Sequence, residues 1–174
     1  IDGGNDATAD SDCEIAPARN LQEVSLASLW QQMDPYLDNY SKERKLQRLI
    51  LAGIYYATNG DYWNESTSWL SYSVDECEWF SKALPEEEVC DENGFYLILD
   101  LHSNGLSGTI PTEIAFLSLL EKLSVGGNTL SGSLPGLENL SNLGVLDANG
   151  NSLNNTIPQS FGQLLSLIHI SEPT

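Results

Sequence analysis

One sequence pattern is written three times in the second half of this 174-residue chain. Each copy carries apolar residues at alternating positions, then an asparagine, then a leucine, and closes on an Ile/Leu-Pro or equivalent pair. The asparagines are Asn104, Asn128 and Asn151, so the period is 24 and then 23 residues. A fixed period of this length indicates a repeat architecture, in which each copy is one unit stacked on its neighbours. The repeat therefore limits the class of fold before any other feature is considered.

The alternation within each copy predicts a short strand with one buried face and one solvated face. Parallel strands stacked about 4.8 Å apart would align the variable positions in three columns on the solvated face. We take these columns as the candidate ligand-binding positions: Ile98, Lys122 and Val145; Asp100, Ser124 and Asp147; His102, Gly126 and Asn149. The alternative, that they are merely solvated strand residues, stays open.

The three asparagines are interpreted as structural. Each stands where the chain leaves the predicted strand, and its amide can pair with backbone groups that the turn would otherwise bury unsatisfied. In the stretch that follows, Gly108 and Gly132 permit a tight turn, and Pro111 and Pro135 prevent a central strand from continuing.

Residues 106–111 read Leu-Ser-Gly-Thr-Ile-Pro and closely resemble the plant-type leucine-rich repeat of receptor kinases and of inhibitors of plant cell-wall hydrolases. The resemblance covers residues 95–164 and implies an α/β fold, a right-handed leucine-rich-repeat solenoid. Upstream, Cys77-Glu-Trp79 followed by Cys90 resembles the N-terminal cap of the same repeat type. That resemblance implies a helical cap over residues 20–94 with a Cys77–Cys90 disulfide.

A zinc site is the other interpretation of two cysteines, but no further cysteine or histidine pair stands at ligand spacing. A calcium loop of the Asp-x-Asp-x-Asn-Gly type is also absent, and residues 91–94 (Asp-Glu-Asn-Gly) are interpreted as a turn into the first strand. We therefore predict no metal site and no cofactor.

Two helices are predicted before the repeats. Ser41 is the expected N-cap of the main helix, which should end at Asn59-Gly60. Its expected apolar stripe consists of Leu46, Leu49, Ile50, Ile54 and Ala57. A weaker helix is expected over residues 21–32. The basic residues 42, 44, 45 and 48 are interpreted as a solvated face that pairs with nearby acids, with contact to an acidic surface as the alternative.

Residues 44–80 as a whole resemble the segment that precedes the repeats in diatom-type leucine-rich-repeat proteins. Members of that group carry an upstream transmembrane helix and expose the repeats outside the cell. The resemblance implies a membrane link only through a segment upstream of this chain, since the longest apolar run here falls short of the ~18 residues that a spanning helix needs.

The two ends of the chain receive separate interpretations. Residues 1–19 are predicted to be a disordered, acidic linker. Residues 165–174 resemble the in-frame translation of a sequencing-library transposase adapter and are excluded from fold reasoning. The alternative is a degenerate fourth repeat, but this would place Glu172 where a core leucine belongs. We expect that further repeats followed in the native protein.

The formal net charge of −18 disfavours binding to nucleic acid. Four sequons, at Asn39, Asn64, Asn139 and Asn154, are compatible with glycosylation and with an extracellular or cell-surface location. Catalytic motifs are missing, and Asp100 with His102 lacks a third group to orient it, so we predict no enzymatic activity.

The sequence thus predicts an extracellular recognition module that binds a protein, peptide or glycan as part of a receptor-like or adhesive membrane protein. A secreted inhibitor of polysaccharide-degrading enzymes and a structural cell-surface protein remain the alternatives. No nucleic-acid partner is expected.

Overall fold

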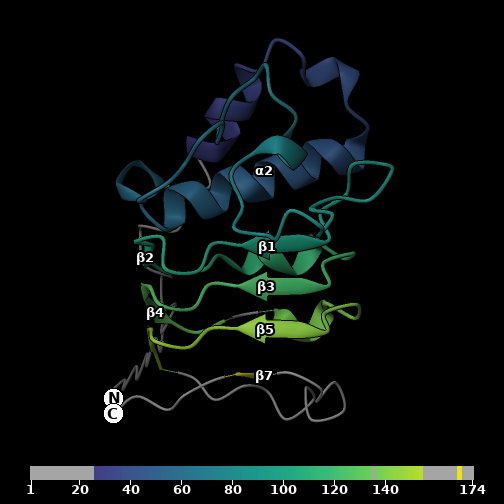
Figure 1. Cartoon of the computed structure of the whole chain (residues 1–174). Coiled ribbons are helices and arrows are strands. Elements are labelled where there is room, and N and C mark those ends of the chain that lie inside the picture. Colours follow the sequence, from purple (N-terminus) through teal and green to yellow (C-terminus); the bar gives the residue numbers. More distant parts are fainter. Residues whose placement is uncertain (1–25, 135, 155–167, 170–174) are drawn as a thin grey trace, which may run out of the picture.

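The computed structural model describes residues 26–134, 136–154 and 168–169 (Figure 1). Short parallel strands are stacked one above another, and the long helix α2 (Lys42–Ala57) lies across the end of the stack next to the first strand. The helical N-terminal segment and the repeats share one continuous apolar core. The fold is that of a leucine-rich-repeat protein with mixed α and β content.

Each coil of the stack has three sides. The first side forms a parallel sheet in the order β1 (Ile98–Asp100), β3 (Lys122–Ser124), β5 (Val145–Asp147) and β7 (Ile168–His169). The second side forms a sheet of β2 (Ser107–Gly108), β4 (Thr129–Gly132) and β6 (Ser152–Leu153). The third side carries the 3₁₀ turns η4 (Thr112–Phe116) and η5 (Leu137–Asn139).

The core leucines of successive coils stand in register. Leu99 pairs with Leu123, and Leu123 pairs with Leu146, so their side chains form one buried column. A second layer inside the coils is formed by Leu106 and Leu130, which are fully buried after the turn. Burial of such side chains stabilises the fold by roughly 1.5–3 kcal/mol each, and every coil depends on its neighbour to achieve it.

Helix α2 begins as predicted, because the Ser41 hydroxyl accepts a hydrogen bond from the Arg44 N–H at 3.2 Å. It ends at Ala57, and Asn59 follows in the left-handed conformation with a φ of 55°. The predicted apolar stripe was partly wrong, since Leu46 is exposed. The buried face is wider than the stripe and also includes Gln47, Arg48, Leu51, Ala52 and Tyr55. It is wide because α2 packs on the repeats and also against the segments that surround it.

The other predicted helix is present over residues 26–32, and residues 21–25 of the prediction lie outside the described residues. The remaining turns of the N-terminal segment are η1 (Leu37–Asn39), η2 (Gly60–Tyr62) and η3 (Glu76–Glu78). Trp30, Trp69 and Trp79 join these pieces, with ring centroids 5.8 Å apart for Trp30–Trp79 and 5.3 Å apart for Trp69–Trp79. Aromatic rings thus supply the core of a segment that has little regular structure.

The prediction of a solvated basic face on α2 was wrong for Arg48, which is fully buried. Its guanidinium lies 2.8 Å from the Glu76 carboxylate and 3.0 Å from that of Asp34, both of which are also buried. Arg44 joins the network through Glu76 at 2.7 Å and through Asp75 at 3.0 Å. The acids come from turns on either side of the helix, so a helical pattern alone could not reveal them.

The N-terminal segment supplies hydrogen-bond partners to three parts of the first coil. At β1, the Asp100 carbonyl accepts from the Lys82 N–H at 2.8 Å, and Val89 accepts from Leu97 at 2.8 Å. At β2, the carbonyl of Ala57, the last residue of α2, accepts from the Thr109 N–H, and that of the C-cap Thr58 accepts from the Ser107 N–H. A Cβ on Gly108 would lie 2.3 Å from the Ala57 carbonyl oxygen, so this close approach of helix and strand requires glycine. The N-terminal edge of each sheet is therefore covered.

The third contact is made to Asn104. Its amide donates to the Glu65 carbonyl at 2.8 Å and accepts from the Glu65 N–H at 2.9 Å, while its own carbonyl accepts from the Asn64 N–H. Residues 64–65 occupy the place that a preceding coil would take. The N-terminal segment thus pairs backbone groups of the first coil at β1, at β2 and at the turn between them.

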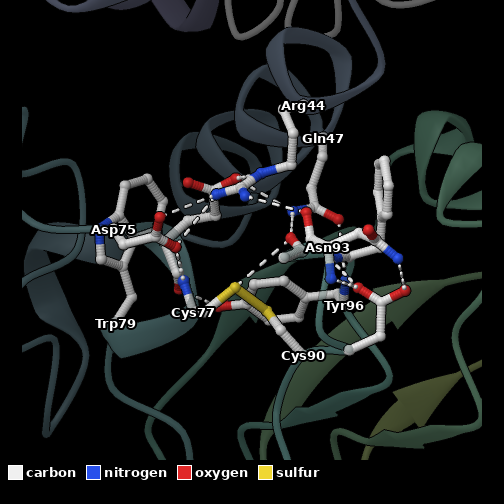
Figure 2. Close-up of a disulfide and its surroundings, with 12 residues drawn as sticks. Arg44, Gln47, Asp75, Cys77, Trp79, Cys90, Asn93 and Tyr96 are labelled. Atoms are coloured by element: carbon white, nitrogen blue, oxygen red, sulfur yellow. Dashed lines mark hydrogen bonds and ion pairs between the residues drawn. A yellow bond between two sulfur atoms is a disulfide. The ribbon is translucent and has the colours of Figure 1, made fainter. Parts of the chain in front are cut away.

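Cys77 and Cys90 form a disulfide across a sequence separation of 13 residues. Figure 2 shows it below Arg44 and Gln47 of α2, between the turn that carries Asp75 and the turn at Asn93. The latter turn forms as predicted, because the Asp91 carboxylate accepts from the N–H groups of Asn93 and Phe95. The bond ties η3 to the chain that enters β1.

The predicted boundaries at residues 1–19 and most of 165–174 lie outside the described residues. Of the C-terminal stretch, β7 pairs in parallel with β5 through Leu146↔Ile168 and Asp147↔His169. This register differs by two residues from that of the degenerate fourth repeat, which would have placed Ile170 opposite Leu146. The origin of the stretch stays a prediction.

Candidate functional site

The outer face of the β1–β3–β5 sheet carries the three predicted columns. The first column aligns by register through the pairs Ile98↔Lys122 and Lys122↔Val145. The second aligns through Asp100↔Ser124 and Ser124↔Asp147. The third follows the same ladder beyond the strand ends, since the Ser103 N–H donates to the Gly126 carbonyl and that of Gly127 to Asn149. The alignment is as expected, whereas the ligand-binding role stays a prediction.

The expectation that all these side chains are solvated was wrong for the second column. Asp100 and Ser124 are each only 4% exposed. Asp100 is covered because its neighbours on both sides turn towards it: the His102 Nδ1 atom lies 2.8 Å away and the Lys122 ammonium 3.2 Å away. Ser124 is small and lies between two longer side chains. Both positions therefore sit on the outer face without offering much surface.

Lys122 is the single basic residue between positions 95 and 174 of the sequence. Its ammonium group lies 3.1 Å from the Glu87 carboxylate and 3.2 Å from that of Asp100. Burial opposes the charged form, but the hydrogen bonds to these two acids outweigh it and raise the pKa of Lys122. The charge of Lys122 is therefore held within the protein, half-buried between two carboxylates.

Glu87 belongs to this site and was missed as a site residue in the sequence analysis. Its carboxylate accepts from the Leu84 N–H at 2.7 Å and reaches Lys122 on β3, and these bonds lower the pKa of Glu87. The three consecutive glutamates at 86–88 opposite a lone lysine were the signal in the sequence. The two residues lie 35 positions apart in the sequence, so no local pattern indicates that they pair.

Asp147 is the β5 member of the second column; in the backbone register His169 of β7 pairs next to it, and Asp147 is half-buried. One of its oxygens accepts from the Asn149 N–H at 3.1 Å. The same oxygen lies 2.7 Å from where a Cβ on Gly126 would be, so the carboxylate leans into the space that a side chain would take. Among the described residues, no lysine, arginine or histidine forms an ion pair with Asp147.

The three asparagines lie inside the coils and face away from the columns. The Asn128 side chain accepts from the N–H groups of Asn104 and Leu106, and it donates to the carbonyls of Leu101, Val125 and Gly126. Asn151 repeats the pattern with Leu130 and Val125. Asn104 bonds to residue 65 in the same manner. These contacts give the asparagines a structural role.

The four sequon asparagines, Asn39, Asn64, Asn139 and Asn154, are all exposed. Asn39 and Asn64 lie on the N-terminal segment, and Asn139 lies on η5 away from the β1–β3–β5 sheet. Their geometry permits attachment of a glycan, and glycosylation itself stays a prediction.

The described residues contain no group of three or more histidine, cysteine or acidic residues placed to hold a metal ion. No helix among them is long and apolar enough to cross a membrane.

Comparison with known proteins identifies the type of repeat in this chain. The Leucine Rich Repeat family model matches residues 97–117 and 142–164. The receptor-like kinase TMK2 of Arabidopsis thaliana is 31% identical over 99 residues, which are 56% of this chain and 10% of that protein. The chain carries plant-type leucine-rich repeats. The diatom-type likeness remains a prediction.

Two further relatives of this leucine-rich-repeat protein bear on its length and fold. Receptor-like protein kinase 7 of Arabidopsis thaliana is 39% identical over 73 residues, or 41% of this chain and 8% of that protein. The crystal structure of PEPR1–AtPEP1 superposes with a TM-score of 0.52 at 23% identity, covering 71% of this chain and 17% of that one. This chain therefore spans about a tenth of the curated relatives' length.

Proposed function

We propose that this leucine-rich-repeat protein is an extracellular recognition module that binds a protein or peptide on the face of the β1–β3–β5 sheet. It forms part of a receptor-like membrane protein, with its anchor outside this chain. In the same proposal the stack is a right-handed solenoid, and the disulfide-bonded N-terminal segment is its cap. The observation that carries the proposal is the aligned set of outward-facing side chains on the sheet.

Three kinds of support favour recognition. The curated relatives are receptor-like kinases, and the segments that match are repeats of the same type. The backbone of each repeat is held by buried asparagines and leucines, so the solvent-exposed outer positions can vary without loss of the fold. The disulfide and the exposed sequons suit a secreted environment.

We also propose that the chain has no enzymatic activity. Asp100 and His102 form a close pair, but the Asp100 carboxylate also contacts the Lys122 ammonium, so two side chains share it. The Asp100 carboxylate is therefore engaged in internal contacts and is not available as a general base for a bound substrate.

A random-peptide display selection tests the recognition proposal. The wild-type protein is compared with Asn149→Trp, which places a large side chain on the third column, and with Glu138→Trp, which places one on the exposed turn η5. Peptides that bind the sheet face are expected to bind the wild-type protein and Glu138→Trp with similar affinity. Their affinity for Asn149→Trp should be lower by tenfold or more.

The proposal fails if no sequence is enriched on the wild-type protein. It also fails if the enriched peptides bind all three proteins equally. Circular dichroism and thermal melting of both tryptophan variants establish that a loss of binding reflects the blocked face and not unfolding.

A further inference from the structure

We propose that the ligand of the β1–β3–β5 face is a cationic peptide, which places a lysine, arginine or free amino group against Asp147 over Gly126. This inference rests on the proposed recognition function and specifies the charge and class of its ligand.

The electrostatics of the face come from residues 87, 98, 100, 102, 122, 124, 126, 145, 147 and 149. Three of them are acids, and one is a lysine. That lysine is already neutralised by Glu87 and Asp100, so the face has no uncommitted ammonium group for an anionic ligand. With neutral His102 the net charge is −2, and an anionic ligand would meet repulsion from Asp147.

Lys82, the other lysine near the face, is not available to bind an anionic ligand either. Lys82 lies beside the end of β1, but its ammonium donates to the Ser103 carbonyl at 3.0 Å. Both lysines near the face are thus engaged in internal contacts, while the Asp147 carboxylate retains one oxygen without a described partner. Electrostatic complementarity of this kind selects the sign of the charge on a ligand.

Local geometry makes Asp147 the contact point. Gly126 has no side chain, and the carboxylate of Asp147 leans over its backbone, with its two oxygens 2.7 Å and 2.9 Å from the position of a Cβ. The Asn149 N–H holds one oxygen in place at 3.1 Å. An approaching ammonium or guanidinium would therefore meet a pre-oriented carboxylate, which reduces the conformational entropy lost on binding.

The sign of the charge also decides between the ligand classes. Polysaccharides that carry carboxylates or sulfates are anionic, so the face would repel them. Lysine and arginine side chains make a peptide the cationic ligand that fits, and an extended peptide can follow the column from Asp147 towards Asp100 across strands spaced about 4.8 Å apart.

Titration followed by amide NMR tests the proposal on the full chain at pH 7.5 and 150 mM NaCl. Three nine-residue glycine–serine peptides serve as probes and carry four lysines, four glutamates or no charged side chains. The lysine peptide is expected to shift the amide of Asn149 and its neighbours, and Asp147→Asn should weaken its binding roughly three- to tenfold. The asparagine oxygen still accepts the Asn149 N–H, so the turn is preserved.

Glu138→Gln is the matched control, because it removes one exposed negative charge from η5. Equal weakening by both variants would overturn the proposal, because it would show attraction to the overall charge of −18 alone. Preferential binding of the glutamate or uncharged peptide to the same amides would also overturn it, while leaving the recognition function standing. Absence of shifts with all three peptides rejects the cationic ligand, and the display selection then decides the recognition function independently.

Discussion

Asn128 connects two coils through its side chain. It takes part in five hydrogen bonds, three of which reach residues 101, 104 and 106 of the first coil. Its side chain is buried, and so are the backbone groups that it pairs. Water cannot replace the side chain at this place, so each lost bond leaves a buried donor or acceptor unsatisfied.

Asn128→Ala is expected to lower the free energy of unfolding by about 2–4 kcal/mol, because several buried backbone groups lose their partners. Urea unfolding followed by tryptophan fluorescence measures the change. Asn142→Ala is the control, since Asn142 is exposed and makes one bond to the Ser118 carbonyl. Similar losses for the two variants would contradict the structural role of Asn128.

Arg48 presents the opposite case of a charge inside the core. Its guanidinium lies over the ring of Tyr40 at 4.6 Å and is paired with Asp34 and Glu76, yet its Nε atom has no partner. Arg48→Met is expected to destabilise the protein by on the order of 3–5 kcal/mol, because two buried carboxylates lose their counter-charge. Chemical denaturation measures this.

Lys45→Met is the matched comparison for Arg48→Met on the same helix. Lys45 pairs with the fully exposed Asp38 at 3.6 Å, where solvent already screens the interaction. We expect little change in stability for this variant. A loss as large as that of Arg48→Met would show that burial does not set the difference.

The buried carboxyl group of Asp100 should make the stability of the fold depend on pH. Burial disfavours its ionised form, but the hydrogen bonds from His102 and Lys122 outweigh burial and lower its pKa below the usual value. A lowered pKa in the folded state means that ionised Asp100 stabilises the fold above the unfolded-state pKa of about 3.9, and that this contribution is lost as the pH falls through the folded-state pKa.

We therefore expect Asp100→Asn to reduce the loss of stability on acidification below about pH 4. Urea unfolding of the wild-type and variant proteins between pH 2.5 and pH 6 tests this. Glu138→Gln should leave the wild-type profile nearly unchanged. An Asp100→Asn profile as steep as that of wild type would refute the assignment.

At the scale of elements, the loop from residue 81 to residue 89 acts as the edge partner of β1. Its two ends are held by the disulfide and by hydrogen bonds to Leu97, Ile98 and Asp100. Glu87 then reaches across β1 to Lys122 on β3. One short loop thereby protects a strand edge and sets the charge of the sheet face.

Replacing both Cys77 and Cys90 by serine is expected to lower stability by about 3 kcal/mol, as the 13-residue separation implies for a closed loop. Hydrogen exchange should accelerate at the amides of Leu97 and Ile98, which donate to Val89. Cys13→Ser serves as the control that keeps the disulfide. Unchanged exchange at both amides would show that the loop needs no covalent tie.

Contacts between neighbouring strands also decide which substitutions the outer face of β3 tolerates. By the alternation of buried and solvated strand positions alone, Ser124→Asp would be tolerated, whereas Leu123→Asp would bury a charge and unfold the protein. Because Ser124 is buried between Asp100 and Asp147 in its column, a third carboxylate there meets two others. The strand alternation correctly placed Ser124 on the outer face, but it could not reveal the side chains that bury it.

At the scale of the whole molecule, the net charge of −18 opposes compactness through repulsion among the acids. Raising NaCl from about 10 mM to about 150 mM should screen this repulsion and raise the melting temperature by a few degrees. The buried Arg48 network is screened much less than exposed charges. A scanning calorimetry series in NaCl checks the sign, and a falling melting temperature would contradict it.

The sequence by itself determined the repeat period, the strand register and the positions of the asparagines. These follow from local rules, because a period of two decides which strand residues are buried and a period of about 23–24 residues decides which coils stack. The N-cap at Ser41 is equally local, since its partner Arg44 lies three residues away.

Only the tertiary structure decided where the charges belong. Arg48 finds Glu76 across 28 residues and Lys122 finds Glu87 across 35, and no local pattern encodes either pairing. Burial of Asp100 and Ser124 likewise depends on the side chains that surround them in space. Electrostatic partners are chosen by three-dimensional proximity, and the low dielectric of a buried site makes that choice energetically important.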